Sequence, residues 1–315
     1  MLENSGCMSA AGKACEAWML RRENEAASAD GKRRSDMIMA ESAGLTDVGM
    51  KRRGNEDALF FSDELGLYMV ADGMGGHQAG EVASAMVVDT FREYMQRYKD
   101  PEAEDGSRNS GDTPDLIDPG AGAAANRLLR LVRMANRAVY EAAVSRPELK
   151  GMGSTLTTVL FSNDTIIALN VGDSPLYLIR AGQIDMVSVP HTVLAEQMAM
   201  GRKGSERLAR EYGHMLTRAM GVEAEVRPDY CELPCLKNDI YVLASDGLSN
   251  KVDSEEIMEI ALAEKPEKAC RMLVDMANER GGEDNITVII VRVRRVRKVK
   301  KKNGNGFWRR LFFRG

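Results

Sequence analysis

The chain has 315 residues, of which 44% are hydrophobic and 29% charged, and it carries a formal net charge of -4 at pH 7. No uninterrupted apolar run approaches the roughly 18 residues of a membrane-spanning helix, which argues for a globular protein and against an integral membrane protein. The N-terminal stretch is too acidic and too broken for a secretory signal, so we expect a cytoplasmic location.

The charges are unevenly distributed along the chain. Of the 43 Lys and Arg side chains, 11 lie between Arg292 and Arg314, where there is no acidic residue. The rest of the chain therefore holds 32 basic against 47 acidic side chains. Such an acidic body is suited to collecting cations and unsuited to a phosphate backbone, so no nucleic-acid partner is expected.

The five cysteines indicate no disulfide framework. Cys231 and Cys235 form a single pair without the second pair that a structural zinc site would need. Isolated, reduced thiols are the better interpretation.

Composition divides the chain into a folded domain with two tails. Residues 1–36 are polar and weakly patterned, which predicts a disordered extension. The folded domain is expected over 37–295, with a mobile loop rich in Pro, Gly, Ser and Asp at 100–122 and a Met-rich, helical segment at 191–221. A basic tail with aromatic residues occupies 296–315.

Hydrophobic periodicity predicts strands and helices in mixed order. The first half is predicted to hold strands at 37–49, 58–61 and 65–72 and amphipathic helices at 81–98 and 125–145. In the second half the predicted strands are 154–162, 165–173 and 175–182, which read as a β-meander, followed by 229–234, 239–246 and 285–293. The last two predicted helices are 254–264 and 266–281.

Acidic residues recur where predicted strands begin or end. They are Asp72, Asp173, Asp246 and Asp284, together with Glu56 and Asp57 just ahead of the strand at 58–61. One such Asp is usually a turn former or a helix cap. Several carboxylates in one cleft would repel one another unless a cation neutralised them, so the repetition indicates a metal site. Oxygen ligands select Mg²⁺ or Mn²⁺ over zinc.

Glycines follow the first of these acids in the stretch "VADGMGGHQAGE". Gly73, Gly75 and Gly76 would let the chain turn away from Asp72 and let backbone carbonyls and a phosphate come close. A merely flexible loop is the alternative.

Seven ordered motifs resemble those of the metal-dependent serine/threonine protein phosphatases, the PPM or type 2C family, in its bacterial branch. They are "GMKRRGNEDA", "VADGMGGHQAGEVAS", "GSTLTTVL", "NVGDSPLYLIR", "HMLTRAMG", "LASDGLSNKV" and "EDNITVIIV", spread over roughly 43–293. The resemblance implies an α+β fold, a four-layer αββα sandwich with two central, mainly antiparallel β-sheets flanked by helices. It also implies hydrolysis of phosphoserine and phosphothreonine on proteins by a metal-activated water.

The resemblance further implies two Mn²⁺ or Mg²⁺ ions bridged by Asp72. Asp246 and Asp284 would complete the shell of the first ion. The second would take the backbone carbonyl of Gly73 and either Glu56 or Asp57, a choice that stays open. Asp173, with Asp246, matches a third metal site of bacterial relatives.

Two further residues match functional positions of the family. Arg52 matches the phosphate-binding arginine, a role that suits its planar fork, whereas the neighbouring Arg53 is less well placed in the motif. His77 could protonate the leaving alkoxide, because imidazole titrates near neutral pH, but a role in structuring the loop is equally open. No Cys or Ser nucleophile is expected.

Two motifs depart from the family pattern. The common "GDSR" reads "GDSP" here, with Pro175 in place of an Arg, and the frequent "DHS" reads "PHT" at 190–192. Neither touches the expected metal ligands. They bear instead on substrate contacts and on segment 191–221, which corresponds to the flap of the family.

Two other functions are compatible with some of these features. A catalytically dead module that only binds phosphoproteins would be free to lose metal ligands, and a two-metal nuclease would need a basic track beside its carboxylates. The expected partners are phosphorylated proteins, among them a Ser/Thr kinase or its targets, and a monomer is expected. The basic tail could bind an anionic membrane surface or an acidic partner, or stay solvated, so a membrane-peripheral location stays open.

Overall fold

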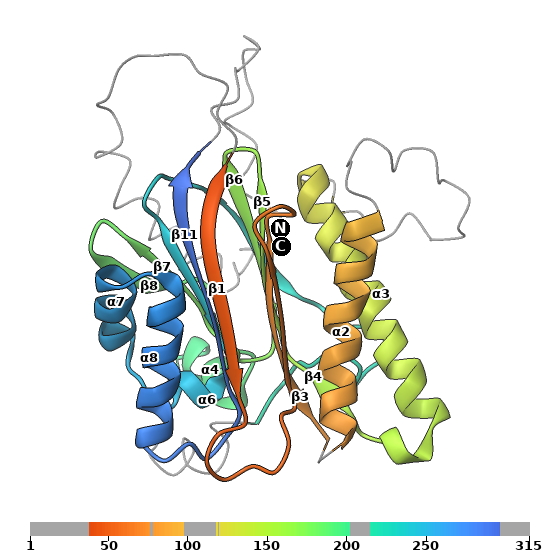
Figure 1. The fold of residues 1–315 in the computed structure, drawn as a ribbon. Coiled ribbons are helices and arrows are strands. Elements are labelled where there is room, and N and C mark those ends of the chain that lie inside the picture. The colour runs from red at the N-terminus through yellow and green to blue at the C-terminus, as the bar shows by residue number, and fades with distance from the viewer. Residues whose placement is uncertain (1–37, 76–77, 98–117, 119, 202–214, 297–315) are drawn as a thin grey trace.

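A computed structural model describes residues 38–75, 78–97, 118, 120–201 and 215–296. The N-terminal extension, most of the loop at 100–122, the centre of segment 191–221 and the basic tail lie outside these residues. Within them, helices and strands build four layers (Figure 1). The predicted α+β class and the αββα sandwich are confirmed.

Two antiparallel sheets form the centre of the molecule. The first contains, in spatial order, β1 (Met39–Asp47), β11 (Ile286–Arg295), β10 (Ile240–Ala244), β7 (Leu176–Arg180) and β8 (Gln183–Met186). The second contains β2 (Asp57–Ser62), β3 (Leu67–Met74), β5 (Leu156–Ser162), β6 (Thr165–Val171) and β9 (Asp229–Pro234), with β4 (Gly153–Ser154) paired to β3.

Helices cover the outer face of each sheet. The second sheet is covered by α2 (Gln78–Arg97) and α3 (Ala123–Ser145), and the first by α7 (Ser254–Ala263) and α8 (Pro266–Glu279) (Figure 1). Shorter helices are η3 (Pro147–Leu149), α4 (Val193–Ala199) and α6 (Asp246–Ser249). No helix in the described part has both the length and the apolar character to cross a bilayer.

Alternation along the central strands produces the layers. On β3, Met69 and Ala71 pack toward α2 and α3, whereas Tyr68 and Val70 pack toward the other sheet. Because successive side chains of a strand point to opposite faces, a continuous apolar run such as "LYMVA" fills two cores at once. The buried strands of both sheets are long apolar runs for this reason.

The predicted β-meander is wrong in its third strand. β5 and β6 pair as expected, but β7 pairs with β10 and β8 in the other sheet. The chain changes sheet across the turn that follows β6, where Gly172 has a φ of +103°. The strands at 165–173 and 175–182 follow each other closely in sequence but belong to different layers.

Three more details differ from the sequence expectation. β8 and the short α6 were not predicted. Within segment 191–221, α4 is helical, but residues 215–221 form turns and isolated bridges, including one from Thr192 to Leu216. The expectation of a helical segment is therefore wrong for its described C-terminal part.

Candidate metal centre

Four aspartates from both sheets gather at one end of the sandwich. Asp57 opens β2 directly opposite Asp72 on β3, because the register of these antiparallel strands pairs the two residues. Asp246 begins α6 just after β10, and Asp284 precedes β11, the antiparallel neighbour of β10. Strand ends that are far apart in sequence thus meet at the same end of the sandwich.

The charges of the neighbouring aspartates act together on Asp72. Its pKa is raised well above the ordinary value, first by burial and then by the charges of Asp57, Asp246, Asp284 and Asp173. Burial disfavours the charged carboxylate, and like charges add to the penalty. Asp72 is held by its main chain, since its N–H donates to Thr155 Oγ1 at 2.9 Å and its carbonyl accepts from Thr155 N–H at 2.8 Å.

The surroundings of Asp57 also disfavour its charged form. Burial, with the charges of Asp246 and Asp284, raises its pKa to about 7, although the hydroxyls of Thr287 and Ser245 oppose the rise. The hydroxyl of Thr287 donates to Asp57 Oδ2 at 2.6 Å, whereas the buried Oδ1 has no hydrogen-bond partner among the described residues. An unpartnered buried carboxylate oxygen is costly unless a ligand takes it.

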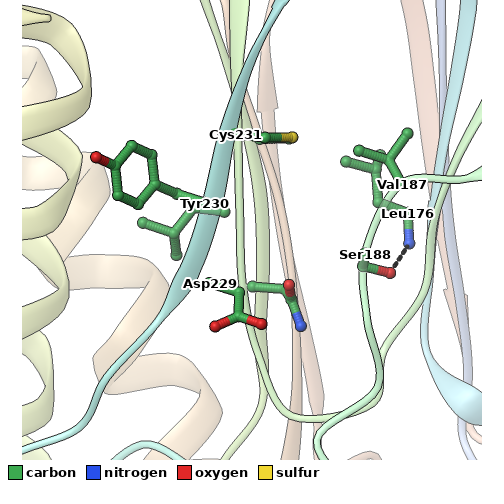
Figure 2. Close-up of a pocket in the computed structure, with 9 residues that line it drawn as sticks. Leu176, Val187, Ser188, Asp229, Tyr230 and Cys231 are labelled. Atoms are coloured by element: carbon green, nitrogen blue, oxygen red, sulfur yellow. Dashed lines mark hydrogen bonds between the residues drawn. The ribbon is translucent and has the colours of Figure 1, made fainter. Parts of the chain in front are cut away.

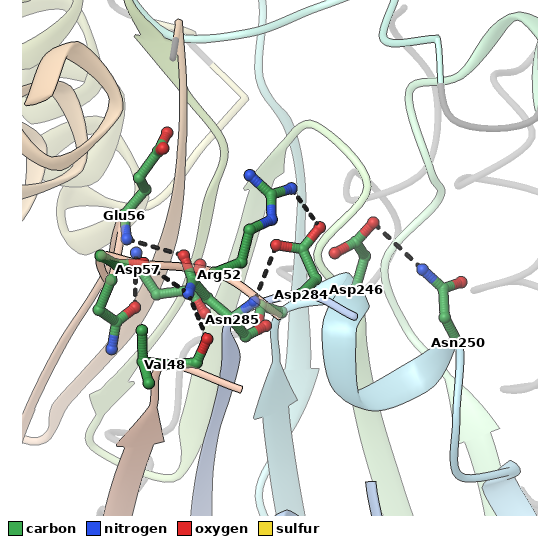
Figure 3. Close-up of polar contacts among 11 residues, drawn as sticks. Val48, Arg52, Glu56, Asp57, Asp246, Asn250, Asp284 and Asn285 are labelled. Atoms are coloured by element: carbon green, nitrogen blue, oxygen red, sulfur yellow. Dashed lines mark hydrogen bonds and ion pairs between the residues drawn. The ribbon is translucent and has the colours of Figure 1, made fainter. Parts of the chain in front are cut away.

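The chemical type of these side chains suits a hard cation. All four converging groups are carboxylates, which bind Mg²⁺ and Mn²⁺ rather than soft metals. Within the described residues they do not already form a group of three or more that encloses an ion. Asp284 is turned toward Arg52, and Asp246 Oδ2 accepts from Asn250 at 3.2 Å (Figure 3).

Arg52 reaches the centre from the loop before β2. Its Nη2 lies 2.8 Å from Asp284 Oδ2, and both side chains remain well exposed, at 46% and 38%. Burial lowers the pKa of Arg52, but Asp284, Glu56 and Asp72 outweigh that effect and raise the pKa overall. Arg52 therefore lies against the acidic cluster through Asp284, and its role in binding phosphate stays a prediction.

Gly73 packs where backbones meet. A Cβ at this position would lie 2.1 Å from the carbonyl oxygen of Gly80 and 2.5 Å from that of Glu56. Gly73 N–H also donates to the Glu56 carbonyl at 3.0 Å. Only glycine fits between the end of β3 and the start of α2.

Glu56 and Asp57 point in different directions. The Glu56 carboxylate lies against the first turn of α2, where a Cβ on Gly80 would be 2.0 Å from its Oε2. Figure 3 shows Glu56 pointing away from Asp246 and Asp284. The geometry therefore brings Asp57, and not Glu56, into the carboxylate cluster.

Asn285 organises the cluster, a role that the sequence reasoning missed. Its Oδ1 accepts from Glu56 N–H at 2.8 Å, and its Nδ2 donates to the carbonyls of Val48 and Gly54 at 2.9 and 3.0 Å (Figure 3). One buried amide thus fastens the loop that carries Arg52 to the start of β11. An Asn beside an Asp looks like an ordinary turn in sequence, so nothing distinguished it.

The last two predicted residues differ in how far they can be placed. Asp173 follows β6 and acts on Asp72 through its charge, which puts it at the edge of the cluster. His77 lies outside the described residues.

A small cavity lies elsewhere, between the edges of the two sheets near Asp229, Ser188 and Cys231 (Figure 2). Figure 2 shows Tyr230 and Cys231 pointing to opposite sides of β9. The cavity measures about 20 Å³, room for little more than one water. It does not contain the acidic cluster and is too small for a substrate.

Comparison with known proteins points in one direction. The family model described as Protein phosphatase 2C matches residues 51–282. The serine/threonine protein phosphatase PstP of Mycobacterium tuberculosis is 31% identical over 251 residues, which are 80% of this chain and 44% of that relative. The serine/threonine phosphatase stp of Listeria innocua is 32% identical over 256 residues, 78% of this chain and 93% of that relative. The chain thus matches less than half the length of its mycobacterial relative.

Solved structures agree with these similarities. The M. tuberculosis phosphatase PstP/Ppp superposes with a TM-score of 0.69 at 30% identity and covers 82% of this chain and 100% of its own. The catalytic domain of PstP, solved in complex with two manganese ions, gives a TM-score of 0.67 at 31% identity, with 82% and 100% coverage.

Proposed function

Because the chain belongs to the protein phosphatase 2C family, we propose that it removes phosphate from phosphoserine and phosphothreonine side chains of proteins. The observation that carries the proposal is the cluster of Asp57, Asp72, Asp246 and Asp284, in which burial and like charge raise the pKa values of Asp57 and Asp72. Divalent cations would neutralise such a cluster.

The proposed ligands follow from where each side chain lies. Asp72 would be shared by two Mn²⁺ or Mg²⁺ ions, with Asp246 and Asp284 completing the first. Asp57 and the Gly73 carbonyl would serve the second, and the unpartnered Oδ1 supports Asp57.

Two finer parts of the metal site are also proposals. Glu56 would not bind an ion directly. It would hold the backbone of Gly73 in place, because the Glu56 carbonyl accepts a hydrogen bond from Gly73 N–H. Asp173, with Asp246, would contribute to a third and weaker ion. The two manganese ions of the PstP catalytic domain support manganese as the metal.

The chain's own groups would handle the phosphate. When bound, the two ions would polarise the phosphoryl group and lower the pKa of the attacking water. Arg52 is exposed, so its guanidinium can exchange Asp284 for two phosphate oxygens and hold the group in line. His77 stays a proposal as proton donor to the leaving alkoxide.

Further proposals concern the whole chain. Residues 37–295 would form the phosphatase domain, and its substrates would include a Ser/Thr kinase or its targets. We keep a monomer and a cytoplasmic location as expectations. A role of the basic tail at a membrane or an acidic partner lies outside the described residues.

Phosphate release from a phosphothreonine peptide with Mn²⁺ tests the proposal. Asp246→Asn should lower the rate by at least about 10³-fold, since metal ions supply several kcal/mol of transition-state stabilisation. Asp164→Asn is the matched control, because Asp164 is an exposed Asp in the turn between β5 and β6, at the opposite end of the second sheet. A wild-type chain that binds the peptide but releases no phosphate would make it a binding module instead.

A further inference from the structure

His191 is a buried histidine that the proposed chemistry does not use. It is the first residue of segment 191–221 and only 1% exposed. Its N–H donates to the Gly172 carbonyl at 2.9 Å, and its ring Nδ1 accepts from Gly172 N–H at 3.1 Å. A single residue therefore binds both main-chain groups of Gly172.

The other side of the imidazole faces Asp229 on β9. Because Nδ1 accepts a hydrogen bond, the proton of the neutral ring lies on Nε2, which is 3.4 Å from Asp229 Oδ2. Asp229 Oδ1 pairs with Arg218 Nη1 at 2.9 Å. Asp229 thus lies against residues at both ends of segment 191–221.

The two ends of the segment also meet directly. Thr217 N–H donates to the His191 carbonyl at 2.8 Å, and Val193 N–H donates to the Met215 carbonyl at 3.0 Å. His191 therefore lies at the base of the segment, where its two described parts, 191–201 and 215–221, meet.

Gly172 leads from this base to the acidic cluster. It has a φ of +103°, and a Cβ there would lie 2.6 Å from Thr155 Cγ2, so its position is tightly determined. Thr155 in turn holds both main-chain groups of Asp72. Asp173 follows Gly172 directly and acts on the charge of Asp72. A continuous chain of contacts joins His191, Gly172, Thr155 and Asp72.

We propose that His191 is a positioning residue, which sets the place of Asp173 relative to Asp72 and couples it to the base of segment 191–221. Asp229 lies on the other side of the imidazole, with its Oδ2 3.4 Å from Nε2. The inference rests on the metal centre of the proposed function. His191 would thus affect Asp173, a proposed metal ligand, through Gly172.

Two substitutions separate the two sides of the ring. His191→Asn keeps an acceptor near the position of Nδ1 but does not reach Asp229, whereas His191→Gln reaches toward Asp229 but lacks the acceptor for Gly172. Both lose the imidazole and its packing. A merely structural role would make them equivalent.

Isothermal titration of the full chain with Mn²⁺ alone measures the effect without any assay of activity. Asp173→Asn identifies the binding event that depends on Asp173. His191→Gln should weaken that event about tenfold, the lower end of the 10- to 100-fold typical of outer contacts to metal ligands, while His191→Asn stays within about twofold of wild type. Added to Asp173→Asn, His191→Gln should have no further effect. Hydrogen exchange at residues 170–174 without metal should be faster in His191→Gln than in His191→Asn.

The control is Asp239→Asn, which breaks the buried contact between Asp239 and Arg180 and should leave the Mn²⁺ titration unchanged. Equal weakening by both His191 variants, an undiminished effect in the Asp173→Asn background, or no effect of Asp173→Asn would each overturn the inference. Absence of any Mn²⁺ binding by the wild type would overturn the metal centre together with it. The predicted titrations without phosphopeptide hydrolysis would support the inference and reject only the proposed catalytic function.

Discussion

Two groups of buried aspartates differ in how their charge is balanced. Asp239 is 1% exposed and receives two hydrogen bonds from Arg180, at 2.7 and 2.6 Å, so its negative charge has a cation of the chain beside it. Asp57 and Asp72 are also largely buried, yet the nearby Arg52 pairs with the exposed Asp284 instead. The first arrangement is complete in the folded chain, whereas the second needs a charge from outside.

This difference separates a structural carboxylate, Asp239, from the carboxylates that we propose as metal ligands. Removing one partner of a buried pair leaves an uncompensated charge, whereas neutralising one of several mutually repelling acids relieves repulsion. Substitutions at the two places should therefore have opposite effects on activity and on stability.

The largest effect is expected at Asp72. Asp72→Asn should reduce phosphopeptide hydrolysis by more than about 10³-fold, because the residue that we propose both ions share is lost. Without divalent ions, its free energy of unfolding should equal or exceed that of the wild type, since a raised pKa marks a charge that the fold disfavours. Denaturant unfolding in chelator checks the second part. A marked loss of stability there would remove the distinction from Asp239.

Asp239→Asn should show the reverse. Breaking the contact with Arg180 should cost about 3 kcal/mol of unfolding free energy, the lower end of the range for buried pairs. The rate constant kcat should stay near the wild-type value, because Asp239 lies away from the acidic cluster. Urea unfolding and steady-state kinetics on one preparation measure both. A loss of kcat with unchanged stability would contradict the account.

The exposed arginine should matter for substrate and little for the fold. Arg52→Ala should lower kcat/KM by about 10- to 100-fold, since hydrogen bonds to charged groups contribute about 1.5–3 kcal/mol. Its effect on unfolding should stay below about 1 kcal/mol, as for other exposed ion pairs. Arg53→Ala, at the next residue, is the matched control and should change neither kcat/KM nor the free energy of unfolding. Equal kinetic losses in both variants would leave Arg52 without its specific role.

The last prediction concerns the pH dependence of stability without divalent ions. Between about pH 4 and 7 the folded chain keeps on Asp57 a proton that the unfolded chain has released, because its pKa in the fold is about 7. The folded state binds more protons in that window, so its stability falls as pH rises, by up to about 1.4 kcal/mol per unit for this one group. Asp57→Asn in chelator should remove that part of the slope. Parallel curves for the two proteins would contradict the pKa shift.

Much of the fold followed from local patterns. The apolar runs of β3, β10 and β11 and the periodicity of α2, α3, α7 and α8 depend only on neighbours in sequence, and all were predicted. The sheet to which β7 belongs depends on tertiary packing and on the turn at Gly172, so it was missed. The acids were recognised because each ends or precedes a strand.

The supporting contacts of the site were not predictable in the same way. Asn285 binds residues more than 200 positions away, and Thr287 donates to Asp57 over a similar separation. His191 acts through Gly172. Such contacts depend on which strand ends meet, and no short stretch of sequence carries that information. Which of Glu56 and Asp57 faces the carboxylate cluster likewise depends on the register of β2 against β3.

The central claim is that the carboxylates of Asp57, Asp72, Asp246 and Asp284 together hold metal ions. Crystals of the full chain grown with Mn²⁺ and measured at the manganese absorption edge test it most directly. We expect two anomalous peaks beside Asp72, one shared with Asp246 and Asp284 and the other with Asp57 and the Gly73 carbonyl. Density without manganese at these carboxylates, or with manganese bound only elsewhere, would contradict the account.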